Sequence, residues 1–206
     1  MFMIRLFLKL CKCFQQNKLN SLSDVDIFNE YIENLDISAL ACPSCGAKDS
    51  LSYLSSYSRH LITYHNGKVI DNIITVPRYI CNSCKSSGKG GSTHAILPPV
   101  IVPYKSYGFS FIIAVLHDHM IKTFTSVKLL CEHYSLPEST FRRILKNFKL
   151  HKDLWLGLLE SKMQPEEKFI SGLKYASYIE KESFIFDFFN RFRISFLQKN
   201  VKFGIP

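Results

Sequence analysis

The sequence predicts an α+β fold, in which a small β-hairpin unit is followed by an all-helical module and a helical tail. Two cysteine pairs predict the hairpin unit: Cys-Pro-Ser-Cys-Gly at residues 42–46 and Cys-Asn-Ser-Cys at residues 81–84. The stretch between them is rich in short apolar runs and turn residues, as in β-hairpins. The helices are predicted by residues 107–152, where apolar residues recur at the i, i+3, i+4, i+7 spacing of an amphipathic helix.

Each cysteine pair has the Cys-x-x-Cys spacing of a knuckle, a tight turn that directs two thiolates at one point. Gly46 gives the first turn its permissive backbone. A redox dithiol would occur once in a βαβ context, and disulfides would suit a secreted chain, which nothing here indicates. Four thiolates complete the tetrahedral shell of a structural zinc ion. The sequence therefore predicts a zinc ribbon over residues 42–98 with one Zn²⁺, bound by Cys42, Cys45, Cys81 and Cys84.

Four apolar runs between the knuckles are expected to be the strands of this ribbon, at residues 51–54, 61–64, 69–70 and 73–76. Asn66-Gly67 is a strong hairpin-turn dipeptide between two of them. Because the spacer is longer than in the usual paired-knuckle pattern, an extra hairpin at this turn is expected to accommodate it. Arg59 and Arg78 within the ribbon are candidate phosphate contacts.

The segments that flank the ribbon are expected to be helical before it and extended after it. Residues 1–14 are predicted to form a basic amphipathic helix, too short and too charged to span a bilayer and favoured to pack on its own domain rather than on a membrane surface. Residues 24–35 are predicted to form a second helix. Three prolines keep residues 93–104 extended, and His94 is expected to pack or hydrogen-bond there rather than serve as a catalytic or metal residue.

Residues 107–152 are predicted to contain three helices. Thr125 or Ser126 can cap the second, and Pro137 fits the first turn of the third. Two short helices with a tight turn and a basic outer face on the second are the pattern of a helix-turn-helix. An ordinary helical hairpin with a solvated basic face is the alternative. The candidate DNA contacts on the outer face are Ser139, Arg142, Arg143, Lys146 and Lys149.

The charge of the chain is concentrated in the same two regions. The net charge is +9, of which residues 42–98 and 117–152 each carry +4. Such clustering is the electrostatic footprint expected of a nucleic-acid-binding protein. The tail is instead dense in aromatics, which must be buried in the chain or against a partner. The predicted division is 1–41 N-terminal helices, 42–98 ribbon, 99–106 proline-rich linker, 107–152 helix-turn-helix and 153–206 helical tail.

The order of these motifs resembles a bacterial family that is similar to the N-terminal DNA-binding part of zinc-ribbon transposases. Besides the knuckles, the resemblance includes an arginine three residues before Cys81, the Thr-His-Ala-Ile-Leu-Pro block at residues 93–98 and Val-Pro-Tyr at residues 102–104. It covers roughly residues 24–160. The resemblance implies that the four cysteines ligate zinc and that the partner is double-stranded DNA.

The function expected from the sequence is that of a cytoplasmic, zinc-stabilised DNA-binding protein, a transposase-like targeting module that is not itself an enzyme. A transposase catalytic domain needs three separated carboxylates on an RNase H-like sheet to hold two metal ions, and neither its strands nor its length is seen after residue 152. The alternatives are an intact nuclease or recombinase with an unrecognised site, a transcriptional regulator, and a protein-interaction adaptor. The aromatic tail would then serve a homo-oligomer or a protein partner.

Overall fold

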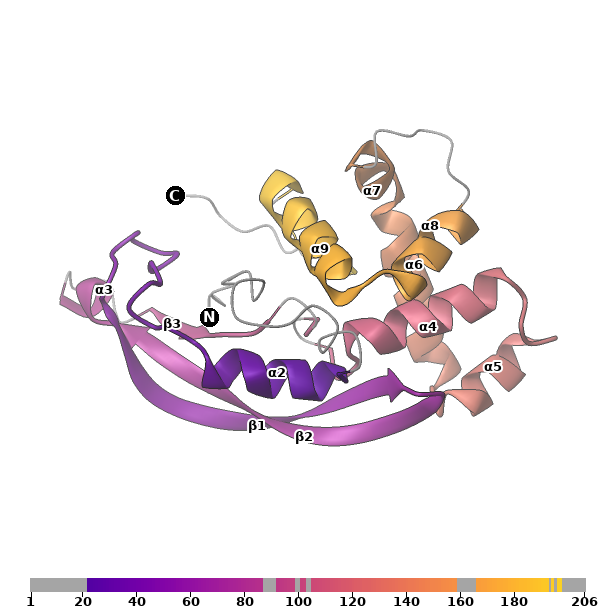
Figure 1. The fold of residues 1–206 in the computed structure, drawn as a ribbon, viewed down its shortest axis with the longest axis horizontal. Helices are drawn as coiled ribbons and strands as arrows, with labels where there is room; N and C mark the ends of the chain where they lie inside the picture. Colours follow the sequence, from indigo (N-terminus) through magenta and orange to yellow (C-terminus); the bar gives the residue numbers. More distant parts are fainter. Residues whose placement is uncertain are drawn as a thin grey trace.

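A computed structural model of the chain describes residues 22–86, 92–98, 101–102, 105–158, 166–192, 194 and 196–197. These residues form a mixed α+β structure with a three-stranded antiparallel sheet and several helices (Figure 1), so the expected fold class is confirmed at this level. The helix expected over residues 1–14 lies outside the described residues. Within the described part of the chain, every helix is too short or too polar to cross a membrane.

One long hairpin dominates the sheet. Strands β1 (Leu51–His65) and β2 (Lys68–Cys81) pair along their whole length, and β3 (Thr93–Ala95) pairs antiparallel with the end of β2. Asn66 and Gly67 both have positive φ, +49° and +76°, as a two-residue type I′ turn requires. The predicted turn is therefore confirmed. The predicted short strands are replaced by two continuous ones, because polar residues of β1 pair across the hairpin as readily as its apolar residues do.

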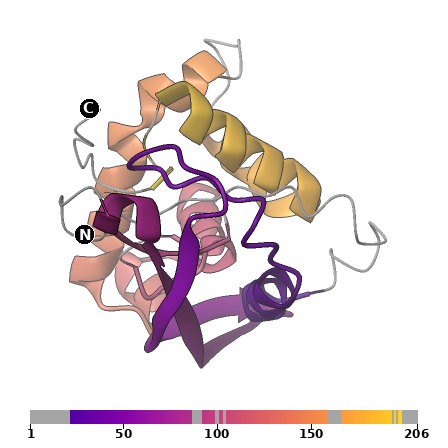
Figure 2. The same ribbon diagram turned by 90° about the vertical axis from the view of Figure 1, so that its left-hand side faces the viewer.

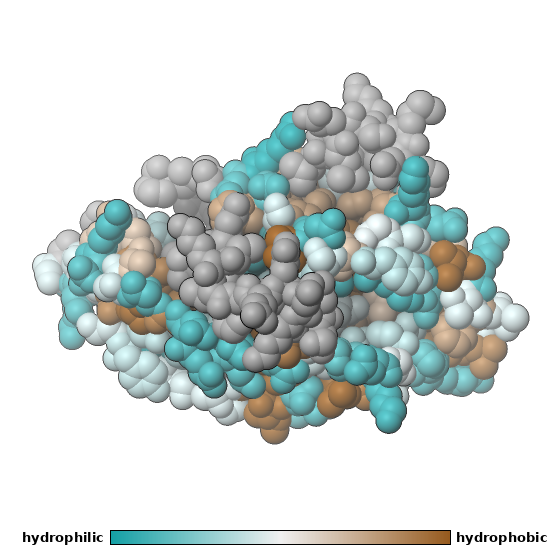
Figure 3. Space-filling view, in the orientation of Figure 1, coloured by the Kyte–Doolittle hydropathy of each residue, from teal (hydrophilic) through white to brown (hydrophobic). Residues whose placement is uncertain are grey.

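A register shift between Tyr53 and Ser55 exchanges the two faces of β1. Beyond it, Leu61 and Thr63 are buried on the inner face of the hairpin, together with Ile74 and Val76 of β2. The outer face is exposed, and isolated hydrophobic spots interrupt its hydrophilic surface along the hairpin (Figure 3). The sheet thus contributes one face to the core.

Helix α2 (Asp24–Glu33) lies on the inner face of the hairpin (Figure 1). It begins with a capping box, since the Ser23 hydroxyl accepts from the Asp26 amide at 3.2 Å and the Asp26 carboxylate accepts from the Ser23 amide at 3.0 Å. Phe28 and Tyr31 are buried, as the periodicity predicted. The helix over residues 24–35 is therefore confirmed, although it ends two residues earlier.

Helix α4 (Phe109–Met120) is the centre of the helical part, with every residue from Phe111 to Asp118 buried. It packs on β1 and on α8 (Glu166–Tyr175). Helix α9 (Tyr178–Phe192) lies on the side of the molecule opposite the hairpin. Figure 2 shows this in a view from the end that carries α3. The remaining helices of this part are α5 (Val127–His133), α6 (Glu138–Leu150) and α7 (Lys152–Leu158).

Several of the described aromatic residues of the tail are buried inside the chain. Trp155 and Phe169 stack with ring centroids 4.1 Å apart, and Phe148 of α6 stacks on Trp155 at 5.5 Å. Phe188 and Phe196 close the cluster. Of the two places expected for these aromatics, inside the chain or against a partner, the buried ones lie inside the chain, where they join side chains of the hairpin and α4 in one hydrophobic core. The division into five segments stays a prediction.

A polar clasp joins the beginnings of α2 and α4. Asp24 is buried, and its Oδ2 accepts hydrogen bonds from the Ser110 amide at 3.2 Å and the Ser110 hydroxyl at 2.7 Å. Gly108 lies directly beside the carboxylate, where a Cβ would collide with it. Burial raises the pKa of Asp24 to about 6, although the bonds from Ser110 oppose the shift.

The clasp makes stability depend on pH. Because the pKa of Asp24 is higher in the folded chain than its ordinary value of 3.8, the folded state holds the proton more tightly, and its stability decreases as pH rises through 6. Between pH 5 and 7.5, the free energy of unfolding of the wild type should fall by about 1–1.5 kcal/mol more than that of Asp24→Asn. Urea unfolding of both proteins at each pH measures this difference, and parallel pH profiles would contradict it.

Candidate metal centre and basic helix

The first cysteine knuckle is a tight loop closed by backbone hydrogen bonds. The Gly46 amide donates to the Cys42 carbonyl at 2.7 Å, and the Cys42 amide donates to the Ala47 carbonyl at 2.8 Å. Gly46 has φ +74°, a conformation that favours glycine. The loop therefore directs Cys42 and Cys45 to the same side.

The second knuckle is formed where the hairpin ends. Cys81 is the last residue of β2, and Cys84 lies on the short helix α3 (Asn82–Ser86) that follows. Leu51, at the start of β1, pairs with Cys81, and the Asn82 amide donates to the Ser50 carbonyl at 2.8 Å. A single long hairpin thus returns the second knuckle to the first, so the extra hairpin expected from the sequence is not needed.

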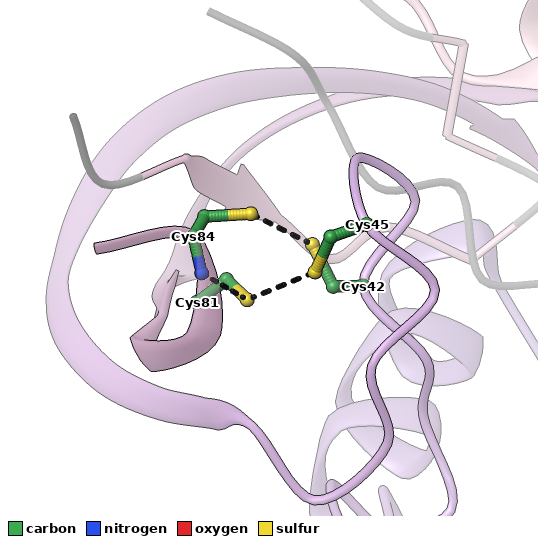
Figure 4. A group of neighbouring side chains, drawn as sticks. All are labelled: Cys42, Cys45, Cys81 and Cys84. Atoms are coloured by element: carbon green, nitrogen blue, oxygen red, sulfur yellow. Dashed lines mark hydrogen bonds between the residues drawn. The ribbon is translucent and has the colours of Figure 1, made fainter. Parts of the chain in front are cut away.

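The four sulfurs point toward one another (Figure 4). All four lie within 4.8 Å of each other, with 3.8 Å between Cys42 and Cys84 and 3.7 Å between Cys45 and Cys81. These distances far exceed a disulfide bond of about 2.05 Å. A tetrahedral ion with metal–sulfur bonds of about 2.3 Å would have sulfur–sulfur edges of about 3.8 Å. The cluster therefore has the chemistry and the size of a site that could hold a metal ion.

Hydrogen-bond donors surround the sulfurs. The Ser44 amide donates to Cys42 Sγ and the Cys84 amide to Cys81 Sγ, each at 3.4 Å. Burial alone would raise the pKa of Cys81, but the Ser50 hydroxyl at 3.4 Å, the Cys84 amide and the neighbouring Cys42 and Cys45 thiols lower it to about 6. Burial raises the pKa of Cys84 to about 12. Metal ligation needs thiolates, and the surroundings of the Cys81 sulfur favour that form.

His94 contributes a contact that the sequence did not assign to the centre. It lies on β3, is 1% exposed, and places Nε2 3.5 Å from Cys42 Sγ. The sequence predicted a packing or hydrogen-bonding role, which this contact confirms. His94 lies beside the cysteines because β3 pairs with β2. The sequence does not signal this pairing, since β3 is only three residues long and lies in a proline-rich stretch.

The second and third helices expected within residues 107–152 are present as α5 and α6. Ser126 caps α5 by accepting from the Leu129 amide at 3.2 Å, and α5 ends with a positive φ of +48° at Ser135. Pro137 precedes the first residue of α6 instead of occupying its first turn. The helix buries Phe141, Ile144 and Phe148 on one side. The opposite side exposes all five predicted residues: Ser139, Arg142, Arg143, Lys146 and Lys149.

Arg59 and Arg78, the two ribbon arginines predicted to contact phosphate, are half-buried, whereas the predicted residues of α6 are exposed. Arg59 lies on the inner face of the hairpin opposite the buried Ile74, and this burial lowers the pKa of its guanidinium. Arg78 is half-buried on β2 and pairs with Ala95 of β3.

Comparison with known proteins adds a family. A search of curated proteins and a search of solved structures each found no match. One family profile matches residues 42–144, which is half of the chain. The matched region begins at the first cysteine of the cluster and ends within α6, so it contains both knuckles, the hairpin, α5 and the first half of α6. The chain belongs to the family described as a domain of unknown function, DUF6431.

Proposed function

We propose that this protein is a zinc-stabilised, double-stranded-DNA-binding module. The observation that carries the proposal is the occurrence, in one chain, of four clustered cysteine sulfurs and an exposed basic helix face, both of which lie at least partly in the family-matched region. Cysteine-only tetrahedral sites are typical of structural zinc. Zinc bound by Cys42, Cys45, Cys81 and Cys84 would fix the end of the hairpin, and the hairpin in turn supports α4.

The proposal takes α5 and α6 as a helix-turn-helix, with α6 in the major groove. The turn supports it, because the Leu136 amide donates to the Cys131 carbonyl at 2.8 Å and the Ser135 amide to the Glu132 carbonyl at 3.1 Å, which closes α5 tightly before α6 begins. The N-terminal part of such a second helix reaches base edges. Arg142 and Arg143 would therefore contact bases, while Lys146 and Lys149 lie nearer the phosphates.

The motif order favours a transposase-like lineage, in which the chain would direct DNA binding and perform no cleavage. A nuclease or recombinase remains the alternative from another class. The cysteine cluster is the metal-binding group found among the described residues, and its four thiolates suit a structural ion better than the oxygen-ligated ions of nucleases. Magnesium-dependent nicking that is lost with one acidic residue would favour the alternative.

Substitutions on α6 should separate base contacts from phosphate contacts. Arg142→Ala or Arg143→Ala should weaken the preferred DNA site by about 1–3 kcal/mol, because arginine can bridge guanine O6 and N7 with two hydrogen bonds. Lys146→Ala and Lys149→Ala should weaken preferred and random DNA equally, since each removes one released counterion. Fluorescence anisotropy with both DNAs over a range of salt concentrations measures the two effects.

All four substitutions remove exposed side chains, so the folded chain should tolerate them. Arg142 makes one exposed ion pair with Glu138 at 3.6 Å, and Arg143 donates to the Thr140 hydroxyl at 3.3 Å. Such surface pairs contribute at most about 1 kcal/mol. If all four variants bind both DNAs as the wild type does, α6 is not the recognition helix.

A further inference from the structure

A hollow of about 710 Å³ lies beside α6. The end of α4, the loop from Lys122 to Ser126 and the start of α5 form one wall, and Leu145 and Lys149 of α6 form another. Leu145 and Lys149 also line a second, shallower hollow on the exposed side of α6. The 710 Å³ hollow, called the flank groove below, is therefore adjacent to the basic face of α6.

The flank groove is cationic. Lys122, Lys149 and His119 line it, and the acidic residue in its lining, Glu166, pairs with Lys152. Among the described residues, neither Lys122 nor Lys149 has a carboxylate within ion-pair distance. Burial lowers the pKa of His119, and the positive charge of Lys149 lowers it further, so Lys149 is near enough to repel a charged imidazole. An anion would relieve this repulsion.

The backbone at Lys122 is strained for a lysine. α4 ends with a Schellman motif, in which the Thr123 amide donates to the Asp118 carbonyl at 3.0 Å and the Lys122 amide to the His119 carbonyl at 3.4 Å. The residue between these two bonds must be left-handed, and Lys122 has φ +56°. Glycine is the usual residue at this position because a Cβ is unfavourable there. A side chain that destabilises its own backbone is a candidate for function.

We infer that Lys122 contacts a backbone phosphate of duplex DNA from the flank groove while α6 lies in the major groove. The inference rests on the proposed function and adds a contact outside α6. Lys149 would face the same strand from the other wall, and the exposed hydroxyls of Thr125 and Ser126 at the groove can donate to phosphate oxygens. A phosphate contact is indifferent to sequence, so Lys122 would set affinity and register but not base preference.

Lys122→Gly tests this inference, because it removes the ammonium and relieves the backbone at once. The variant should unfold at the same or a higher urea concentration than the wild type. Its plot of log K against log salt should be less steep by about 0.9, with equal loss of affinity for preferred and random DNA. Lys122→Arg keeps the charge and should keep the wild-type slope.

Ser135→Gly is the matched control, since Ser135 holds the same left-handed position after α5 but carries no charge. It should stabilise the chain without changing the salt slope. A wild-type slope in Lys122→Gly, with wild-type DNA binding intact, would overturn the Lys122 contact and leave the proposed function standing. Failure of the wild type itself to bind duplex DNA would overturn both.

Discussion

Removal of the proposed zinc ion is expected to unfold the hairpin together with the helices packed on it. Structural zinc supplies on the order of 10 kcal/mol to the fold of a small domain. The net stability of a whole domain is about 5–15 kcal/mol, so the loss is comparable to the total. Circular dichroism during titration with a chelator should show loss of structure that added zinc restores.

Cys45→Ser is the sharpest variant for this test. Cys45 is the exposed member of the cluster, so its replacement removes a ligand with little loss of packing. Cys131→Ser is the matched control, because Cys131 is also a free thiol but lies buried on α5, away from the cluster. The control should keep one zinc per chain. Elemental analysis that finds no metal in reduced, natively purified wild type would contradict the account of the centre.

Loss of the Lys174 ammonium should cost about 3–5 kcal/mol of stability. Asp118 at the end of α4 is nearly buried and accepts hydrogen bonds from the Tyr134 hydroxyl at 2.8 Å and from Lys174 Nζ at 3.0 Å, while His117 Nδ1 lies 2.9 Å away. Burial alone would raise the pKa of Asp118, but these three partners lower it. Lys174→Met would leave the carboxylate buried with its main counter-charge removed.

Urea unfolding of Lys174→Met, Asp118→Asn and the double variant measures this coupling. The double variant should recover part of the loss, since it buries no unpaired carboxylate. Because the pKa of Asp118 is depressed in the folded chain, its contribution to the free energy of unfolding is present above about pH 4. This contribution is lost as the pH falls further. A loss under 1 kcal/mol in Lys174→Met would mean that α8 is not anchored to α4 by this network.

The local features of this fold were predictable because their signals are local. Cys-x-x-Cys spacing identified the cluster, Asn66-Gly67 identified the turn, and helical periodicity identified α2 and the buried side of α6. Each signal depends on residues within about two turns of helix or one hairpin. The sequence could therefore supply the four clustered cysteines and the exposed basic residues before any coordinates.

The features that were missed depend on contacts between distant segments. The bond from Ser110 to Asp24 spans 86 residues, and that from Lys174 to Asp118 spans 56. A serine at the start of α4 or an aspartate at its end looks like an ordinary surface residue in the sequence. Lys122 was missed for another reason, since its left-handed backbone stands where the sequence offers no glycine to mark the turn.

The central claim, that this zinc-stabilised chain reads duplex DNA through α6, is tested most directly by selecting bound sequences from a random pool of duplex DNA with zinc-loaded protein. The account predicts enrichment of a defined motif containing guanine, which Arg142→Ala or Arg143→Ala relaxes at one position while binding to other DNA persists. Recovery of no DNA above background, or of sequences that α6 substitutions leave unchanged, would contradict it.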